Sequence, residues 1–330
     1  MIGPVPTVRR RSHAATTERR RSSVLLAIVV VGLTGCGGAS GSAPGLIVFS
    51  GHPRGELGDG YNNILVMNSD GTGVRRLTRT DGDIDPSWSP DGAQVVYTRA
   101  TTLAGCDFDP ACAQIWIVGA DGSNARPLTP PSARSEAPDW SPDGKHIVFQ
   151  QWNVPYDYDP GSIDIYVMNV DGSGVRQLTD GPGASESPEW TADGEQIVFS
   201  REVGGDYETW IMNADGGDPE RLTQLGALSP DGKKIVTTRQ SDDDLCPDLV
   251  VMNADGSEER RLLSPEEGGS DLAWSPDSSQ IAFIQCVKTP VETDIVGSEI
   301  WVMDADGDNA HALPAGPYAS PWGLDWAAAP

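Results

Sequence analysis

The stretch IYVMNVDGSGVRQLTDGPGASESPEWTADGEQIVFS, Ile165 to Ser200, holds one full period of a pattern that recurs along most of the chain. A short apolar run ends in an Asp-Gly pair, and a second short run ends in Leu-Thr. A polar loop then leads to Trp190, another Asp-Gly pair and a new apolar run. Asp-Gly between alternating apolar residues predicts a β-hairpin, because Gly accepts positive φ without steric cost. Each period therefore predicts four antiparallel strands.

The pattern occurs six times, with 40 to 51 residues between successive copies. The first Asp-Gly turn is found at Asp70, Asp121, Asp171, Asp215, Asp255 and Asp306. The second signature, Trp-Ser-Pro-Asp-Gly or a variant, begins at Trp88, Trp140, Trp190, Leu228, Trp274 and Trp326. Self-similarity at this period is typical of propellers, and no stretch shows sustained helical periodicity. The sequence predicts an all-β fold, a six-bladed β-propeller over residues 46–327.

The two ends of the repeat region complete one another. The first copy begins at its second strand, Ile47 to Phe49, and the missing first strand is found around Gly323 to Trp326. One blade is therefore expected to combine N-terminal strands with a C-terminal strand, which closes the ring and hides its edges. The Asp-Gly pairs are interpreted as turns, and the recurring Trp residues as packing between blades.

The combined motif, N-x-D-G and R-x-L-T followed by W-S-P-D-G and I-V-F, resembles the TolB-type propeller repeat. It is also similar to the propellers of prolyl-oligopeptidase-like enzymes, in their non-catalytic part alone. The resemblance covers Gly45 to Trp326 and implies an envelope protein that uses its propeller for protein contacts. The α/β domain that precedes the propeller in TolB is not expected here, because few residues separate Cys36 from the first strand.

The N-terminal region predicts export. Two clusters of three Arg precede an apolar run from Val24 to Val31, which is too short to span a bilayer comfortably. The sequence from Leu33 to Cys36 resembles the lipobox of bacterial lipoproteins, and a Gly/Ser-rich stretch follows. We expect a signal peptide over 1–35, lipidation of Cys36 and a flexible tether over 36–45. The predicted location is the outer face of the cell membrane or the periplasm, with the lipid as the only membrane contact. An ordinary signal peptide that contains Cys is the alternative.

Charge and cysteine content narrow the range of partners further. The chain has 23 basic and 48 acidic residues. Residues 1–35 hold six of the basic residues and one of the acidic residues. The rest carries a net charge of −30, which repels phosphate backbones, so no nucleic-acid partner is expected. Four cysteines follow Cys36, and three pairings are open to them. The loop positions favour Cys106–Cys112 and Cys246–Cys286 disulfides.

Residues that vary within the constant repeat are the candidates for ligand binding. In an antiparallel blade the connections between strands two and three, and from strand four to the next blade, emerge on the same face. We predict a ligand-binding face there, since variable loops on a rigid scaffold often carry binding residues. The candidates are Arg99, Arg201 and Arg239 after the second strands, Glu136 and Glu186 on loops before the first strands, and Trp152 and Tyr156 in a long loop. Alternatively, the Arg residues pair with nearby Glu and join blades.

Catalytic signatures are weak. The three His residues after Cys36 have no metal-ligand spacing, and neither a C-x-x-C motif nor a nucleophile elbow is present. We therefore predict no catalytic residue, no metal and no cofactor. The predicted function is non-catalytic binding of an envelope protein, peptide or glycan by a monomeric propeller. The alternatives are a propeller polysaccharide hydrolase or lyase that uses Glu136 or Glu186, and a structural envelope protein.

Overall fold

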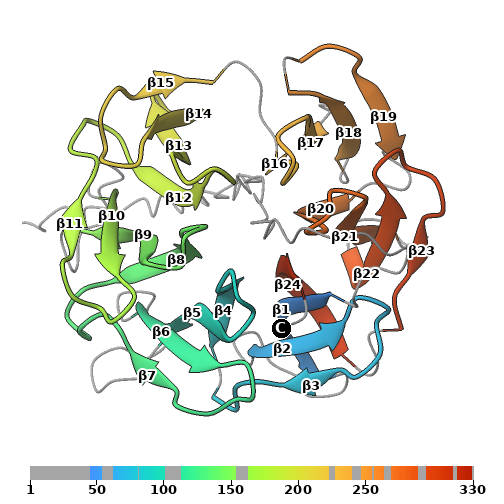
Figure 1. Cartoon of the computed structure of the whole chain (residues 1–330), viewed down its shortest axis with the longest axis horizontal. Coiled ribbons are helices and arrows are strands. Elements are labelled where there is room, and N and C mark those ends of the chain that lie inside the picture. Colours follow the sequence, from blue (N-terminus) through green and yellow to red (C-terminus); the bar gives the residue numbers. More distant parts are fainter. Residues whose placement is uncertain are drawn as a thin grey trace, which may run out of the picture.

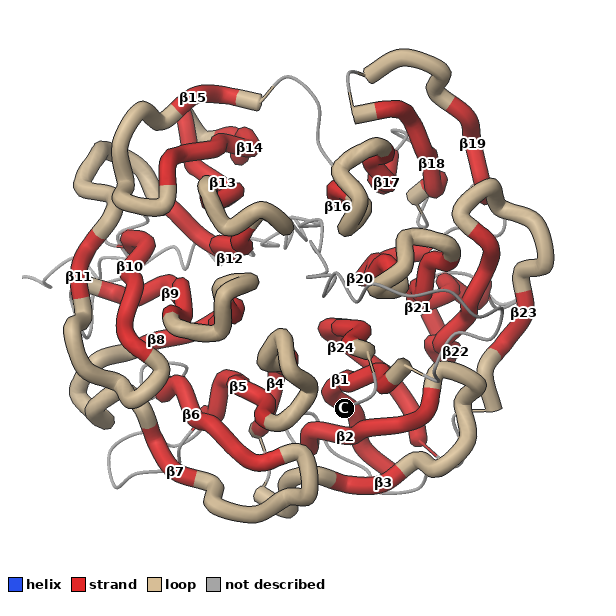
Figure 2. Tube along the Cα trace, viewed as in Figure 1, coloured by secondary structure: helices blue, strands red, loops and turns tan. Residues whose placement is uncertain are grey.

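The computed structural model describes residues 45–53, 62–80, 82–100, 113–153, 163–222, 227–239, 247–254, 256–263, 269–288, 295–314 and 318–328. These residues form six four-stranded antiparallel sheets arranged as blades around an axis (Figures 1 and 2). No α-helix occurs in the described ranges, and hence none there that could cross a membrane. The predicted fold, an all-β propeller with six blades, is confirmed.

Each blade is named here by its strands, from the axis outward. Blade one contains β24 (Tyr318–Ala327), β1 (Leu46–Pro53), β2 (Asn63–Asn68) and β3 (Arg75–Arg76). Blade two contains β4 (Asp83–Trp88), β5 (Gln94–Ala100), β6 (Ala113–Gly119) and β7 (Arg126–Pro127). Blade three contains β8 (Ser135–Trp140), β9 (His146–Trp152), β10 (Ile163–Asn169) and β11 (Arg176–Gln177).

The second half of the ring repeats this order. Blade four contains β12 (Ser185–Trp190), β13 (Gln196–Val203), β14 (Asp206–Asn213) and β15 (Glu220–Arg221). Blade five contains β16 (Ala227–Leu228), β17 (Lys234–Arg239), β18 (Asp248–Asn253) and β19 (Arg260–Leu263). Blade six contains β20 (Gly269–Trp274), β21 (Gln280–Lys288), β22 (Ile295–Asp304) and β23 (His311–Ala312).

The ring closes within blade one. Strand β24 pairs antiparallel with β1, which places Ile47 opposite Trp326 and Val48 opposite Asp325. The innermost strand of this blade therefore comes from the C-terminal region and the other three from the N-terminal region (Figure 1). The predicted combination of both ends in one blade is confirmed.

The recurring tryptophans lie where blades meet. Trp88, Trp140, Trp190, Trp274 and Trp326 are all less than 5% exposed. They belong to apolar clusters that combine blades one and two, two and three, three and four, and, in one larger cluster, five, six and one. Their interpretation as packing residues is confirmed.

The innermost strands share a backbone irregularity beside the axis. Three residues before its Trp, each of five inner strands has positive φ, at Asp85, Ala137, Ser187, Asp271 and Gly323. The strand register shifts at this point, for example between Glu136 and Asp139. Such a bulge bends a strand and redirects its side chains. The inner strand still pairs with the second strand on the other side of the bulge, and residues of the candidate site lie on that paired segment.

Candidate functional site

The face with the variable connections is called the loop face here. Its best-described connection is the hairpin between β13 and β14, where Val203 pairs with Asp206. The two residues between them, Gly204 and Gly205, have φ of 68° and 99°. Two consecutive positive φ values are typical of a tight type I′ hairpin turn. This sequence therefore makes a rigid projection on blade four.

A cluster on blade three combines a charge pair with an aromatic ring. Arg134 Nε donates to Glu136 Oε1 at 2.8 Å, and the Arg134 guanidinium carbon lies 3.7 Å from the centroid of the Trp152 ring. The other carboxylate oxygen of Glu136 accepts from Gln150 Nε2 at 3.3 Å. The Arg134 and Glu136 side chains are only 11% and 19% exposed, which limits the screening of this pair by solvent.

Blade four carries a second cluster beside the first. Tyr207 Oη donates to Glu186 Oε1 at 3.2 Å, and the Arg201 guanidinium lies 5.3 Å from the centroid of the Trp210 ring. Burial raises the pKa of Glu186, and repulsion from Glu136 adds to this effect, while the Tyr207 hydrogen bond opposes it. Burial and the neighbouring Glu186 raise the pKa of Tyr207 to about 12.

The two clusters form one surface. Ser187 N in β12 donates to Gln150 Oε1 in β9 at 2.7 Å, which joins the blades directly. Glu136 and Arg134 on blade three also act electrostatically on Glu186 of blade four. We call this surface the blade three–four patch; it comprises Arg134, Glu136, Trp152, Glu186 and Tyr207.

The predicted position of the two Glu residues is corrected by the structure. Glu136 and Glu186 were expected on loops, but each is the second residue of an inner strand. Glu136 pairs with Gln150 and Glu186 with Ser200, because strand pairing resumes on the far side of the bulge. Each carboxylate is thus fixed by its own inner strand, β8 or β12, next to residues of the second strand of that blade.

The three candidate Arg residues have different surroundings. Arg99 makes two hydrogen bonds to Asp83, at 2.6 and 3.0 Å, and lies 4.2 Å from the centroid of the Trp116 ring. Arg239 makes two bonds of 2.7 Å to Glu259 at an exposed site on blade five. Arg201 lies over the Trp210 ring and pairs with Ser185 and Glu208, so it is on the face of the blade-four sheet opposite Glu186 and Tyr207. The alternative expectation, pairing with Glu that joins blades, is met only in part: Arg239 pairs with a Glu and Arg99 with an Asp, and each pair lies within one blade.

Several predicted positions lie outside the described residues. These are the signal peptide, Cys36 and its tether up to residue 44, Cys106, Cys112, Cys246, Tyr156, and the side chain of Cys286. The two disulfides and the lipidation of Cys36 stay predictions. Among the described residues, no three or more His, Cys, Asp or Glu side chains are grouped so that they could hold a metal ion.

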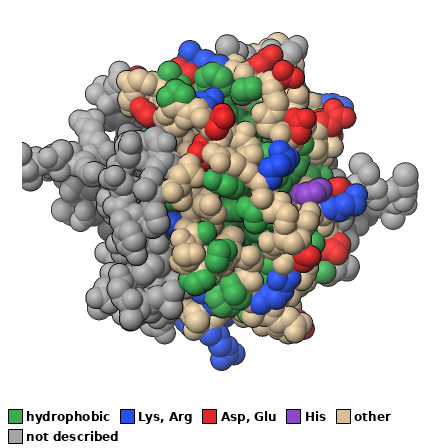
Figure 3. Space-filling view, turned by 90° about the vertical axis from the view of Figure 1, so that its left-hand side faces the viewer, with side chains coloured by type: hydrophobic (Ala, Val, Ile, Leu, Met, Phe, Trp, Pro, Cys, Tyr) green, Lys and Arg blue, Asp and Glu red, His purple; other side chains and the backbone are tan. Residues whose placement is uncertain are grey.

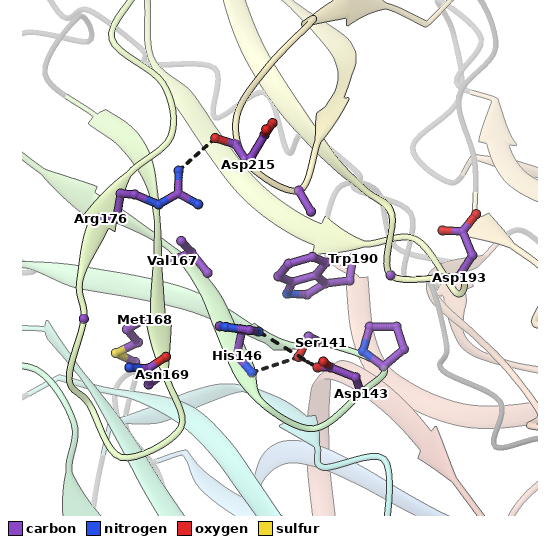
Figure 4. A pocket seen from close by; sticks show the side chains of 14 residues that line it. Ser141, Asp143, His146, Val167, Met168, Asn169, Arg176, Trp190, Asp193 and Asp215 are labelled. Atoms are coloured by element: carbon purple, nitrogen blue, oxygen red, sulfur yellow. Dashed lines mark hydrogen bonds and ion pairs between the residues drawn. The ribbon is translucent and has the colours of Figure 1, made fainter.

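A cavity of about 470 Å³ lies between blades three and four, at the turns opposite the loop face (Figure 4). Its walls include His146 and Arg176 from blade three, and Trp190, Asp193 and Asp215 from blade four. The cavity could not be predicted from the sequence, because its volume depends on how two blades pack. One signal was present, since β9 begins with His146 where β5, β13 and β21 begin with Gln.

The molecule is thus a closed six-bladed β-propeller with a polar and aromatic patch on one face and a cavity between two blades. The family model of the TolB β-propeller domain matches residues 156–314. The Tol-Pal system protein TolB of Rhizorhabdus wittichii is 36% identical over 87 residues, which are 26% of this chain and 18% of that protein. The Tol-Pal system protein TolB of Zymomonas mobilis is 33% identical over 87 residues, which are 26% of this chain and 17% of that protein.

A solved structure extends the likeness to most of the chain. The crystal structure of TolB from Acinetobacter baumannii superposes with a TM-score of 0.66 at 19% identity, covering 87% of this chain and 67% of that one. The chain is a TolB-like β-propeller protein. Its matching stretch spans less than a fifth of the two curated relatives, and the structural likeness concerns the fold.

Proposed function

We propose that the chain is a non-catalytic envelope protein that binds a protein partner through the loop face of blades three and four. The observation that carries this proposal is the hairpin tip of blade four. Among the described residues, three large hydrophobic side chains are markedly exposed, and two of them, Val203 at 44% and Tyr207 at 38%, belong to this tip. They extend from opposite faces of the hairpin, because Val203 pairs with Asp206 and Tyr207 with Glu202. Each face of the tip therefore presents one exposed apolar side chain beside an acid, which fits a groove in a partner.

The adjoining patch supplies further features of a protein interface. Tyr, Trp and Arg are the residue types that most often dominate binding energy, and Tyr207, Trp152 and Arg134 lie together there. Glu136, Glu186 and Glu202 add negative charge. They lie close together, because Glu136 and Glu202 both raise the pKa of Glu186 by repulsion. The expected partner groove therefore has an apolar floor and basic side chains at its rim, which the acidic propeller attracts.

Photo-crosslinking tests this function directly. A photoreactive amino acid is placed at position 207, and separately at 175, in the full chain expressed in its own cell envelope. Val175 is the matched control, because it is 49% exposed but stands beside the outer strand of blade three. We expect one reproducible protein adduct from position 207 and none from position 175. The identified partner, once purified, should bind Val175→Ser normally and the double variant Val203→Ser/Tyr207→Ser at least about tenfold more weakly. Equal binding of both variants contradicts the proposal.

The proposed location rests on the N-terminal pattern and on the relatives. Export, cleavage before Cys36 and lipidation give a propeller tethered to a membrane, either in the periplasm or at the outer face of the cell membrane. Labelling of cells with a radioactive fatty acid should label the chain, and Cys36→Ser should abolish the label. Incorporation that persists in Cys36→Ser excludes anchoring at this residue.

A polysaccharide hydrolase or lyase is the second candidate function. The observation that favours it is the electrostatic coupling of Glu136 and Glu186, together with the raised pKa of Glu186, since perturbed carboxyl pairs are typical of acid–base sites. Incubation with envelope polysaccharides discriminates the two candidates. Release of oligosaccharides that is lost in Glu186→Gln supports the enzyme, whereas no release supports the binding protein.

A further inference from the structure

The cavity between blades three and four is a second site, on the face opposite the proposed protein-binding surface. Its volume of about 470 Å³ falls in the range of roughly 300–1,000 Å³ usual for small-molecule sites. Val167, Trp190 and Ala214 give it an apolar lining, and polar side chains surround this lining (Figure 4).

One polar group of the wall is buried without a partner. Trp190 is 4% exposed, and its Nε1–H has no hydrogen-bond partner among the described residues. An unpartnered Nε1–H is common in this fold, since Trp88, Trp140 and Trp326 at the same repeat position have one too. Trp88 and Trp326 border a cavity of only about 10 Å³ and Trp140 does not line the larger cavity, so of these four only Trp190 has room for a ligand beside it. A buried donor without a partner costs about 1–3 kcal/mol, so a ligand oxygen that accepts from Trp190 gains this energy back.

The remaining polar groups provide both donors and acceptors. Arg176 uses one guanidinium nitrogen, Nη1, to donate to the backbone oxygen of Asp215 at 2.8 Å, and His146 lies beside Asp143, with Nδ1 at 4.0 Å from Asp143 Oδ1 (Figure 4). Asp193 and Asp215 each use Oδ1 to accept from their own turns. Their Oδ2 atoms make no hydrogen bond to the described residues in the structure, so these atoms are acceptors for a ligand.

This combination determines the class of ligand. The carboxylates of Asp143, Asp193 and Asp215 oppose an anion, and an ammonium cation, which only donates hydrogen bonds, cannot accept from Arg176. A neutral molecule with several hydroxyl groups can accept from the donors of the lining and donate to its carboxylates, because each hydroxyl both donates and accepts. Its C–H surface can pack against Val167 and the edge of Trp190. We propose that the cavity binds a short neutral saccharide.

The unusual residue of this blade supports a specific role. His146 begins β9, whereas Gln94, Gln196 and Gln280 begin the equivalent strands of three other blades. Position 146 therefore departs from the repeat at the cavity wall. His146→Gln introduces the residue found at this position in three other blades, so this variant is expected to fold and tests only the cavity.

The test uses the indole signal of Trp190 in an ¹⁵N-labelled full-length sample, assigned with Trp190→Phe. The probes are cellobiose, maltose, lactose and N,N′-diacetylchitobiose, added one at a time. We expect at least one of them to shift the Trp190 signal in a saturable way. His146→Gln should weaken that binding by about tenfold, and Ala214→Leu, which fills the cavity, should abolish it.

The control places the same bulk elsewhere. Ala120 occupies the matching turn of blade two, so Ala120→Leu should leave saccharide binding unchanged. Circular dichroism and the midpoint of thermal unfolding establish that each variant is folded. The proposal is overturned if none of the four disaccharides moves the Trp190 signal, or if Ala214→Leu and Ala120→Leu bind equally well. Neither result bears on protein binding at the loop face, which is measured separately.

Discussion

At the level of single residues, partly buried carboxylates join the inner strands of neighbouring blades. Asp139 Oδ2 accepts from the backbone N–H of Trp190 at 2.8 Å, and its Oδ1 accepts from Ser87 Oγ at 2.9 Å. Asp325 Oδ2 accepts from the N–H of Trp88 at 2.6 Å and Oδ1 from that of Trp326 at 2.7 Å. Burial raises the pKa of Asp139 to about 7 and that of Asp325 to about 6.

The raised pKa of Asp139 predicts how stability depends on pH. A carboxyl with a higher pKa in the folded state opposes folding once it ionises, so its cost grows from about pH 4 and is complete above about pH 7. Lowering the pH from 8 to 5 should therefore stabilise the protein. Asp139→Asn should be more stable than the wild type at pH 8 and should gain less on acidification. Urea denaturation at pH 5 and 8 measures this, and parallel changes in both proteins would contradict it.

Asp325→Asn is the control for this prediction. Both carboxylate oxygens of Asp325 accept from backbone N–H groups, so the amide NH₂ must face one donor. We expect a loss of about 1–3 kcal/mol in the free energy of unfolding at pH 5, and a smaller loss at pH 8, where the amide also removes the cost of ionising a carboxyl with a pKa of about 6. An amide that is tolerated at both positions would mean that the bonds to the Trp backbones contribute little.

Arg99 and Arg201 show what the sequence could and could not predict at this scale. The repeat correctly placed both at the same register, where Arg99 pairs with Asp83 and Arg201 with Ser185. Their roles differ because Asp83 is a buried carboxylate that bonds its Arg, whereas Ser185 offers no charge. Assigning these roles required knowledge of which inner-strand residue faces each Arg.

Substitution to Ala should separate the two roles. Arg99→Ala leaves Asp83, which is fully buried, without its charged partner, and should cost about 3–5 kcal/mol of stability. Arg201→Ala should cost less than about 1 kcal/mol and should instead weaken partner binding at the loop face. Urea denaturation of both variants gives the comparison. Similar losses of stability would show that Arg201 also has a structural role.

At the scale of whole blades, the junction between blades four and five differs from the others. Among the described residues, no apolar cluster combines these two blades. Ile211 in β14 is only partly buried, whereas the matching Val167 in β10 is buried. The sequence indicates this difference in two ways. Leu228 replaces Trp in blade five, and the step from Asp215 to Asp255 is the shortest between successive repeats, 40 residues. The repeat period alone still predicted six equal blades.

Hydrogen exchange should detect this difference between blades. We expect the amides of β14 to exchange at least about tenfold faster than those of β10, since local opening is easiest where few apolar contacts hold a strand. Mass spectrometry of peptides from 163–169 and 206–213 provides the rates. Equal protection of the two strands would mean that blade five packs against blade four as tightly as other neighbours do.

At the scale of the whole molecule, stability depends on ring closure between β24 and β1. The sequence predicted this closure because a missing first strand at one end matched an extra one at the other. The cavity between blades three and four could not be predicted in this way, since its size depends on how the two blades pack. Repeats thus define the ring, and departures from the repeat define its sites.

Trp326 tests how much this closure contributes. It is 3% exposed, lies in β24 opposite Ile47, and packs in the cluster shared by blades five, six and one. Trp326→Ala should therefore cost about 3–5 kcal/mol of unfolding free energy. Leu228 occupies the same repeat position at the loosely packed junction and is only partly buried, so Leu228→Ala should cost less than half as much. Urea denaturation followed by far-ultraviolet circular dichroism measures both losses. If Leu228→Ala loses as much free energy of unfolding as Trp326→Ala, the packing of β24 at the ring closure contributes no more to stability than the packing at the junction of blades four and five.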